Sequence, residues 1–319
     1  MTARESAPKA AVRLVTVSDD QAGQRIDNFL TSRLKGVPRS RLYRLLRKGE
    51  VRVNKGRIGP AYRVQAGDIV RIPPVRMAEK AAPMPAASTL EFLSGRIVHE
   101  DKRLLVLDKP AGMAVHGGSG LSFGVIEALR AARPDAPFLE LVHRLDRDTS
   151  GCLMIAKRRS YLRSLHDMLR QGAVEKQYLA LVRGQWQLGK TLLEDRLGTH
   201  QRRDGERHVE LDEDGKLAAS RFRPVQIWPR ATLMEVALLT GRTHQIRVQA
   251  TAAGHPLAGD DKYGDPVFNR QMARIGLKRM FLHAHSLSFD DPVSGELRSF
   301  SAPLPKDLGS VIDKLGKSA

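Results

Sequence analysis

The chain has 319 residues and a net charge of +18, with 53 Lys and Arg against 35 Asp and Glu. That length fits one large domain plus a smaller one, and the excess of positive charge favours a polyanionic partner, nucleic acid before an anionic membrane. Cys152 is the only cysteine, which excludes an intrachain disulfide and a thiolate zinc cluster, and no apolar run approaches the roughly 18 residues that span a bilayer.

The first folded piece is predicted over residues 12–75, after a disordered N-terminus at 1–11. Apolar residues recur at helical spacing over 26–34 and 42–46, and strand-like alternation around a turn follows at 51–72. The pattern predicts two short amphipathic helices and a hairpin. Because the start also lacks a secretory apolar core, we expect a cytoplasmic protein.

Positive charge is concentrated in this first piece. Residues 33–71 contain twelve Lys or Arg and only two acids. Arg41, Arg44 and Lys48 follow one face of the second helix while the leucines face inward, and guanidinium groups on such a face suit RNA phosphates. A solvated face is the alternative, but it would usually carry acids for pairing. The stretches RIDNFLTSRL, SRLYRLLRKGEVRVN and AGDIVRI resemble the S4 RNA-binding domain.

A linker rich in Ala and Pro is predicted at 76–88, followed by a larger domain at 89–310 and a C-terminal tail at 311–319. Short apolar runs in the larger domain predict strands of a mostly antiparallel mixed sheet flanked by helices and loops, so the expected class is α+β. Residues 199–216 are charged and contain glycine, which predicts a mobile hairpin tip or loop.

The most informative stretch of the larger domain is HRLDRDTSG, residues 143–151, between two apolar runs. Asp146 stands there among arginines. An aspartate can act as a covalent nucleophile, and a neighbouring cation keeps it ionised. Alternatively, the segment is a turn in which Asp148 caps backbone amides and Asp146 pairs with an arginine. The residues of the turn do not decide between the two.

Three further features could take part in chemistry. Arg242, in GRTHQIRV at an expected helix start, could hold Asp146, or Arg247 could hold a phosphate. Tyr178 lies in an expected strand, where its ring could stack on a base or pack in the core. The pair His283 and His285 alternates on one strand, and without a third ligand we favour packing or hydrogen bonding over a metal site.

Taken together, these segments resemble the RluA family of RNA pseudouridine synthases. The matching stretches are DKPAGMAVH, HRLDRDTSG, KQY, GRTHQIRV and YGD, in the family's order and over nearly the whole chain. Within the family, residues 164–170 and 178–186 are most like one group of synthases of the large ribosomal subunit. One departure is Gln249, where the family commonly has histidine; we expect it to affect local packing or RNA contact.

The resemblance implies that the enzyme isomerises uridines of large-subunit (23S) ribosomal RNA to pseudouridine with no metal or other cofactor. Asp146 would attack a flipped-out uridine at the ribose C1′ or the base C6. Arg242 would pair with Asp146, and Tyr178 would stack on the base and take part in removing the C5 proton. Arg144 would enter the RNA and Ile246 would line the pocket.

Two other functions are weighed against this one. A non-catalytic RNA-binding or ribosome-assembly factor would use the S4-like piece for docking, but such a protein gains nothing from an aspartate in a basic groove. An RNA hydrolase would use Asp146 and Asp148 as paired carboxylates. We expect a monomer, because self-repulsion at +18 opposes association.

Overall fold

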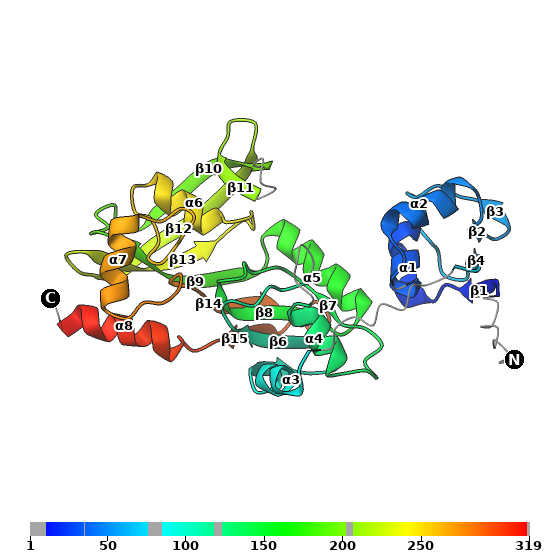
Figure 1. Cartoon of the computed structure of the whole chain (residues 1–319), viewed down its shortest axis with the longest axis horizontal. Coiled ribbons are helices and arrows are strands. Elements are labelled where there is room, and N and C mark those ends of the chain that lie inside the picture. The colour runs from blue at the N-terminus through cyan, green and yellow to red at the C-terminus, as the bar shows by residue number, and fades with distance from the viewer. Residues whose placement is uncertain (1–10, 35, 76–84, 118–122, 202–206, 318–319) are drawn as a thin grey trace, which may run out of the picture. The chain divides into compact units, whose positions relative to one another are not determined.

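A computed structural model describes residues 11–34, 36–75, 85–117, 123–201 and 207–317 (Figure 1). The backbone contacts divide the chain into two compact units, Met1–Ala82 and Pro83–Ala319. The expected disordered N-terminus and most of the expected linker lie outside the described residues. Among the helices of the described ranges, none has the length and apolar character needed to cross a bilayer.

The smaller unit packs two helices on a four-stranded antiparallel sheet of order β1-β4-β2-β3. The leucines of α2 are buried while Arg39, Arg44 and Arg47 of the same helix are exposed, as the helical spacing predicts. Its elements in chain order are β1 (Arg13–Thr16), a 3₁₀ turn (Asp19–Gln21), α1 (Ile26–Arg33), α2 (Arg39–Arg47), β2 (Arg52–Val53), β3 (Gly56–Arg57) and β4 (Ile69–Ile72).

The larger unit is built on one mixed sheet, so the expected α+β class with a mostly antiparallel sheet is confirmed. The path runs β11-β10-β12-β13-β9-β14-β8-β6-β5, and among the described strands only β14 and β8 pair in parallel. Its strands are β5 (Ile97–Glu100), β6 (Leu104–Lys109), β7 (Glu140–Leu141), β8 (Ser150–Ala156), β9 (Glu175–Arg183), β10 (Thr191–Gln201), β11 (Arg207–Leu211), β12 (Lys216–Ile227), β13 (Ala231–Leu238), β14 (Leu282–Asp290) and β15 (Leu297–Ser301).

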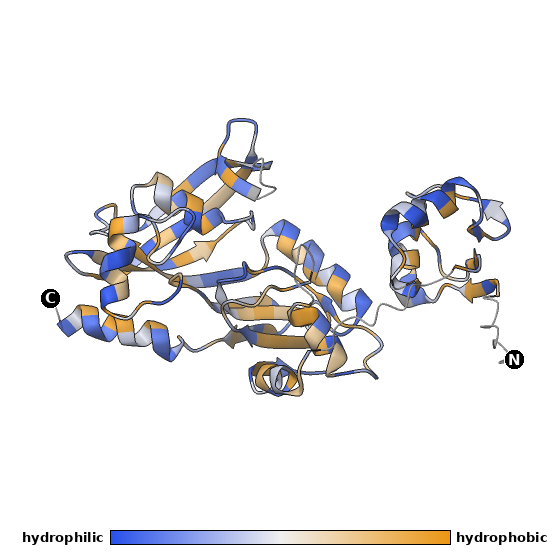
Figure 2. Cartoon of the chain, viewed as in Figure 1, coloured by the Kyte–Doolittle hydropathy of each residue, from blue (hydrophilic) through white to orange (hydrophobic). Residues whose placement is uncertain are grey.

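Helices cover both faces of this sheet. On one side of β6 and β8, α4 packs into the main core, and on the other side α5 contributes Tyr161 and Leu165 to a second core. Every residue of β8 is therefore buried, which explains its uninterrupted apolar run (Figure 2). The helices are α3 (Ala87–Ser94), α4 (Val125–Ala131), α5 (Arg159–Gln171), α6 (Gln245–Ala252), α7 (Pro266–Arg274) and α8 (Lys306–Lys317).

Two segments differ from the sequence prediction. Within the segment predicted as a mobile hairpin tip or loop, residues 207–211 form the strand β11, paired in antiparallel register with β10. Val209 on this strand is buried, so its apolar side chain stabilises the pairing. The expected C-terminal tail from residue 311 is part of α8, because Val311 and Leu315 pack with α7 against the sheet.

The central strand β14 brings two distant segments together. Ala284 pairs with Tyr178 of β9 on one side and with Gly151 of β8 on the other. Gly151 has a φ of 110°, and a side chain there would collide with the Ala284 carbonyl, so only glycine fits. The turn before β8 is thereby fixed beside β9.

Candidate active site

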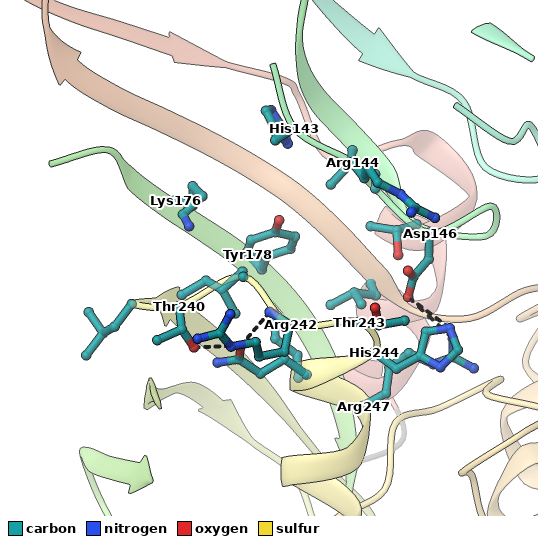
Figure 3. A pocket seen from close by; sticks show the side chains of 18 of the residues that line it. His143, Arg144, Asp146, Lys176, Tyr178, Thr240, Arg242, Thr243, His244 and Arg247 are labelled. Atoms are coloured by element: carbon teal, nitrogen blue, oxygen red, sulfur yellow. Dashed lines mark hydrogen bonds and ion pairs between the residues drawn. The ribbon is translucent and has the colours of Figure 1, made fainter. Parts of the chain in front are cut away.

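A pocket of about 500 Å³ opens in the larger unit where three segments meet (Figure 3). The turn before β8 contributes Arg144 and Asp146, and β9 contributes Tyr178. The bend before α6 and the first turn of that helix form a third wall, residues 240–247, and the end of α5 adds Leu169 and Arg170. The volume lies in the range of sites for small molecules or single nucleotides, roughly 300–1,000 Å³.

A buried lysine fixes the turn that carries Asp146. Lys109 is 0% exposed, and its Nζ donates to the carbonyl oxygens of Pro110 (2.8 Å), Met113 (2.8 Å) and Arg147 (2.9 Å). Burial lowers the pKa of Lys109 to about 7, against the opposing charges of Asp148 and Asp146. Lys109 thus ties the main chain at Arg147, one residue beyond Asp146, to the main chain at Pro110 and Met113.

The carboxylate of Asp146 faces the first turn of α6. Arg247 Nη1 lies 3.4 Å and His244 Nε2 lies 3.8 Å from the same oxygen, Oδ2. Arg247 is itself held by the buried Asp260, through Nε at 2.7 Å and Nη2 at 2.8 Å. Burial alone would raise the pKa of Asp260, but the hydrogen bonds and charge of Arg247 outweigh it and lower that pKa.

The predicted pairing of Arg242 with Asp146 is therefore wrong. The helix begins at Gln245, so Arg242 lies in the bend before it, where its Nε donates to the carbonyl of Leu217. Arg247 lies within the first two turns of α6 and reaches the carboxylate instead. Arg242 lines the pocket as an exposed side chain (Figure 3).

Tyr178 forms the buried wall of the pocket and is only 7% exposed. Burial, followed by the nearby charge of Asp146, raises the pKa of its phenol, so the hydroxyl keeps its proton at neutral pH. Lys176 lies two residues earlier on β9 and lines the same pocket. Burial lowers the pKa of Lys176.

The other predicted site residues divide between the units. Arg144 is exposed on the pocket lining, and Ile246 is buried in the pocket wall. Arg41, Arg44 and Lys48 belong to α2 and its C-terminal cap in the smaller unit. Arg44 and Lys48 are exposed there, as expected for a phosphate-binding face.

The two histidines of β14 both contact the main chain after β15. His283 Nε2 and His285 Nδ1 each lie 3.1 Å from the carbonyl oxygen of Ala302, which confirms hydrogen bonding. Within the described ranges, no group of three or more His, Cys, Asp or Glu side chains has the arrangement of a metal site.

Gln249 is fully buried, so its role is packing rather than RNA contact. Its Nε2 donates to Asp195 Oδ2 (2.8 Å) and to the carbonyls of Leu193 and Ala218, joining α6 to β10 and β12.

Sequence reasoning missed four residues that shape the site: Lys109, His244, Asp260 and Tyr263. Three of them lie inside the stretches DKPAGMAVH, GRTHQIRV and YGD. Asp260 lies just before the last of these stretches, and only the fold shows its contact with Arg247.

The sequence matches the family model described as "RNA pseudouridylate synthase" over residues 103–252 and the model described as "S4 domain" over residues 24–70. It is 56% identical over 307 residues to "Ribosomal large subunit pseudouridine synthase C" of Pasteurella multocida, covering 96% of this chain and 94% of that protein. The protein of the same name in Escherichia coli K12 is 54% identical over 309 residues, covering 96% and 97%.

Solved structures share the fold of the larger unit. "Human RNA Pseudouridylate Synthase Domain Containing 4" aligns with a TM-score of 0.60 at 22% identity, covering 72% of this chain and 96% of that one. "Human RNA Pseudouridylate Synthase Domain Containing 1" aligns with a TM-score of 0.58 at 24% identity, covering 73% and 96%.

Proposed function

Since the chain belongs to the family of RNA pseudouridine synthases, we propose that it converts uridines of large-subunit (23S) ribosomal RNA to pseudouridine with Asp146 as the nucleophile. The names of relatives at 54–56% identity over nearly their whole length support this substrate. The observation that carries the assignment of Asp146 is its carboxylate in a nucleotide-sized pocket, with Arg247 and His244 both on Oδ2.

The reaction rearranges bonds without net hydrolysis. Asp146 forms a covalent bond to the uridine, the N1–C1′ bond breaks, and the detached uracil rotates in the pocket. C5 then bonds to C1′ and the bond between the uridine and Asp146 breaks. C5 loses its proton and N1 gains one, so the product contains the same atoms as the uridine. The base has to leave the RNA stack to reach the carboxylate, because stacked bases hide these atoms. Water has to stay out, since it would hydrolyse the detached sugar.

Each remaining residue has a role that its position supports. Tyr178 stacks on the uracil as a neutral phenol, because burial raises its pKa. A neutral hydroxyl relays the C5 proton by passing its own proton on as it accepts the new one. Arg144, exposed at the pocket, enters the RNA in place of the flipped base, and Ile246 packs against that base. Arg242 is a suitable cation for an RNA phosphate.

The smaller unit docks the RNA through Arg41, Arg44 and Lys48, and the larger unit carries out catalysis. We place the protein in the bacterial cytoplasm during ribosome assembly, where unfolded ribosomal RNA is accessible. A monomer is favoured, because the positive surface has to meet one large polyanion.

Tritium release from ribosomal RNA labelled at C5 of uridine tests the proposal. Asp146→Ala is expected to lower the single-turnover rate by at least about 10⁴-fold, as removal of other enzymatic nucleophiles does. Asp148→Asn is the matched control, because Asp148 is nearly half exposed and forms an ion pair with its neighbour Arg147. Full release by Asp146→Ala would refute the nucleophile, and loss in both variants would favour paired carboxylates.

A further inference from the structure

A chain of polar contacts links the main chain of β11 to Asp146. The backbone N–H of Val209 donates to the hydroxyl oxygen of Tyr263 at 3.0 Å. The same hydroxyl lies 2.8 Å from Nδ1 of His244, and the other ring nitrogen, Nε2, lies 3.8 Å from Oδ2 of Asp146. The proposed reaction leaves His244 and Tyr263 without a role.

The direction of each hydrogen bond follows from the donors present. The Val209 N–H can only donate, so the Tyr263 oxygen accepts there. In the part of the chain that the structure describes, the hydroxyl proton has one further partner, His244 Nδ1. Nδ1 is then an acceptor. A neutral imidazole carries a single proton, which has to be on Nε2, the nitrogen that faces Asp146.

The surroundings of the ring also favour its neutral form. Burial lowers the pKa of His244, and Arg247 and Lys262 add to this effect, whereas Asp146 and Asp260 oppose it. Arg247 stacks over the Tyr263 ring with its guanidinium carbon 4.9 Å from the centroid. The full positive charge of Arg247 thus already faces the Asp146 carboxylate. A neutral His244 ring can orient that carboxylate through its N–H without adding a second positive charge.

The backbone shows that this placement is enforced. His244 has φ 53° and ψ 20°, a left-handed conformation that costs a non-glycine residue about 1 kcal/mol or more. The conformation is retained directly before α6, where it aims the ring between Tyr263 and Asp146. Strain of this kind persists where the surrounding contacts over-determine it.

We propose that Tyr263 holds His244 in the tautomer protonated on Nε2, and that this N–H positions the Asp146 carboxylate for attack. His244 is a positioning residue, since it acts through Asp146. The contact of 3.8 Å is longer than a hydrogen bond and shortens when the uridine enters, as contacts of catalytic groups often do. The proposal rests on the assignment of Asp146 as the nucleophile.

Two substitutions distinguish the ring nitrogens. The amide nitrogen of His244→Gln lies close to the position of Nε2, whereas that of His244→Asn lies close to Nδ1. We expect His244→Gln to keep the single-turnover rate at saturating RNA within about 10-fold, and His244→Asn to lose about 100-fold, the usual effect of one missing donor. The affinity for RNA should be the same in both.

Backbone strain cannot make His244→Gln faster than His244→Asn, because asparagine tolerates the left-handed conformation better than glutamine does. A purely structural role would therefore favour His244→Asn in both stability and rate. Equal rates, or a faster His244→Asn variant, would overturn the proposal.

Nitrogen-15 NMR of the histidine side chains tests the tautomer without any RNA. The His244 signals are expected to show an unprotonated Nδ1 and a protonated Nε2, and Tyr263→Phe should shift them toward a mixture. Tyr161→Phe is the matched control, because the Tyr161 hydroxyl bonds Asp291 on the far side of the sheet. A wild-type His244 protonated on Nδ1 would refute the proposed tautomer even if Asp146 proves to be the nucleophile. If Asp146 proves not to be the nucleophile, the NMR measurement still reports the tautomer, so the two failures can be told apart.

Discussion

In the smaller unit, positive side chains are exposed to solvent on the outer face of α2. In the larger unit, ion pairs and polar groups are buried beneath the pocket. In the smaller unit the buried acids Asp27 and Asp68 accept hydrogen bonds from the hydroxyls of Tyr43 and Tyr62. In the larger unit Lys109 and Asp260 are almost completely buried. All ten histidines also belong to the larger unit.

The difference follows from what each unit has to do. Exposed charges attract RNA over long distances and are screened by salt, so they suit docking. Charges in a dry pocket are strong and fixed in direction, so they suit the stabilisation of a reacting carboxylate. The predictions below test this contrast, beginning with the largest effect.

Breaking the buried ion pair should have the largest effect. Arg247→Ala leaves the buried carboxylate of Asp260 unpaired, which is expected to cost about 3–5 kcal/mol of stability, and it removes the cation from Asp146. The single-turnover rate should fall by about 10²–10³-fold. Thermal melts and tritium release measure the two losses.

Arg242→Ala is the control for that experiment, because its side chain is exposed and does not touch Asp146. The stability of Arg242→Ala should change by less than about 0.5 kcal/mol. Its loss of activity should appear as a higher KM rather than a lower kcat. If Arg242→Ala costs more in kcat than Arg247→Ala does, the exchange of roles between the two arginines is refuted.

Acid should destabilise the larger unit first. Burial lowers the pKa of His143 and His283 to about 4, below the value of about 6.5 in an unfolded chain. Above about pH 6.5 these histidines are mainly neutral in both the folded and the unfolded state, so they add little pH dependence to the free energy of unfolding. As the pH falls from about 6.5 toward 4, only the unfolded state takes up the proton, so each histidine costs about 2–3 kcal/mol by about pH 4.5.

Hydrogen exchange followed by mass spectrometry on the full chain would resolve the two units. The smaller unit has no histidine, and its acids Asp27 and Asp68 have lowered pKa values, so it should keep its protection through this pH window. Equal loss of protection in both units between about pH 6.5 and 4.5 would contradict the contrast.

Removal of exposed charge should weaken binding without touching the chemical step. Changing Arg41, Arg44 and Lys48 together to alanine is expected to reduce the slope of log affinity against log salt by about 0.9 for each phosphate that is no longer neutralised. The single-turnover rate at saturating RNA should stay unchanged. The double variant Arg41→Lys, Arg44→Lys keeps the charge and should keep the slope; an altered rate at saturation would show that α2 also affects catalysis.

The smallest effect is expected at Gln249. Gln249→His introduces the family's usual residue, and an imidazole N–H can replace the donor to Asp195 while the buried amide oxygen that lacks a partner among the described residues disappears. Stability should change by less than about 1 kcal/mol, with RNA affinity unchanged. A change in the salt dependence of RNA binding would contradict its placement in the core.

Sequence reasoning went furthest where one segment is sufficient. The helical spacing of leucines in α2 and the unbroken apolar run of β8 both predict local structure, because the period of each pattern can be read from residues that are close in the sequence. For residues 199–216 the sequence predicts a mobile hairpin tip or loop, but it does not predict the strand β11, which forms by pairing with β10. The predicted pairing of Arg242 with Asp146 failed, because the sequence does not show which of the two arginines in GRTHQIR, Arg242 or Arg247, reaches the carboxylate.

The sequence alone determined the family, the α+β class and the turn that carries Asp146, because short motifs of fixed spacing carry that information. Only the tertiary structure decided which side chains meet that aspartate. Strand β14 places the turn beside Tyr178, and a helix that begins at Gln245 rather than at Gly241 directs Arg247, not Arg242, toward the carboxylate. Contacts between residues far apart in the chain depend on strand order and helix register, which no local pattern encodes.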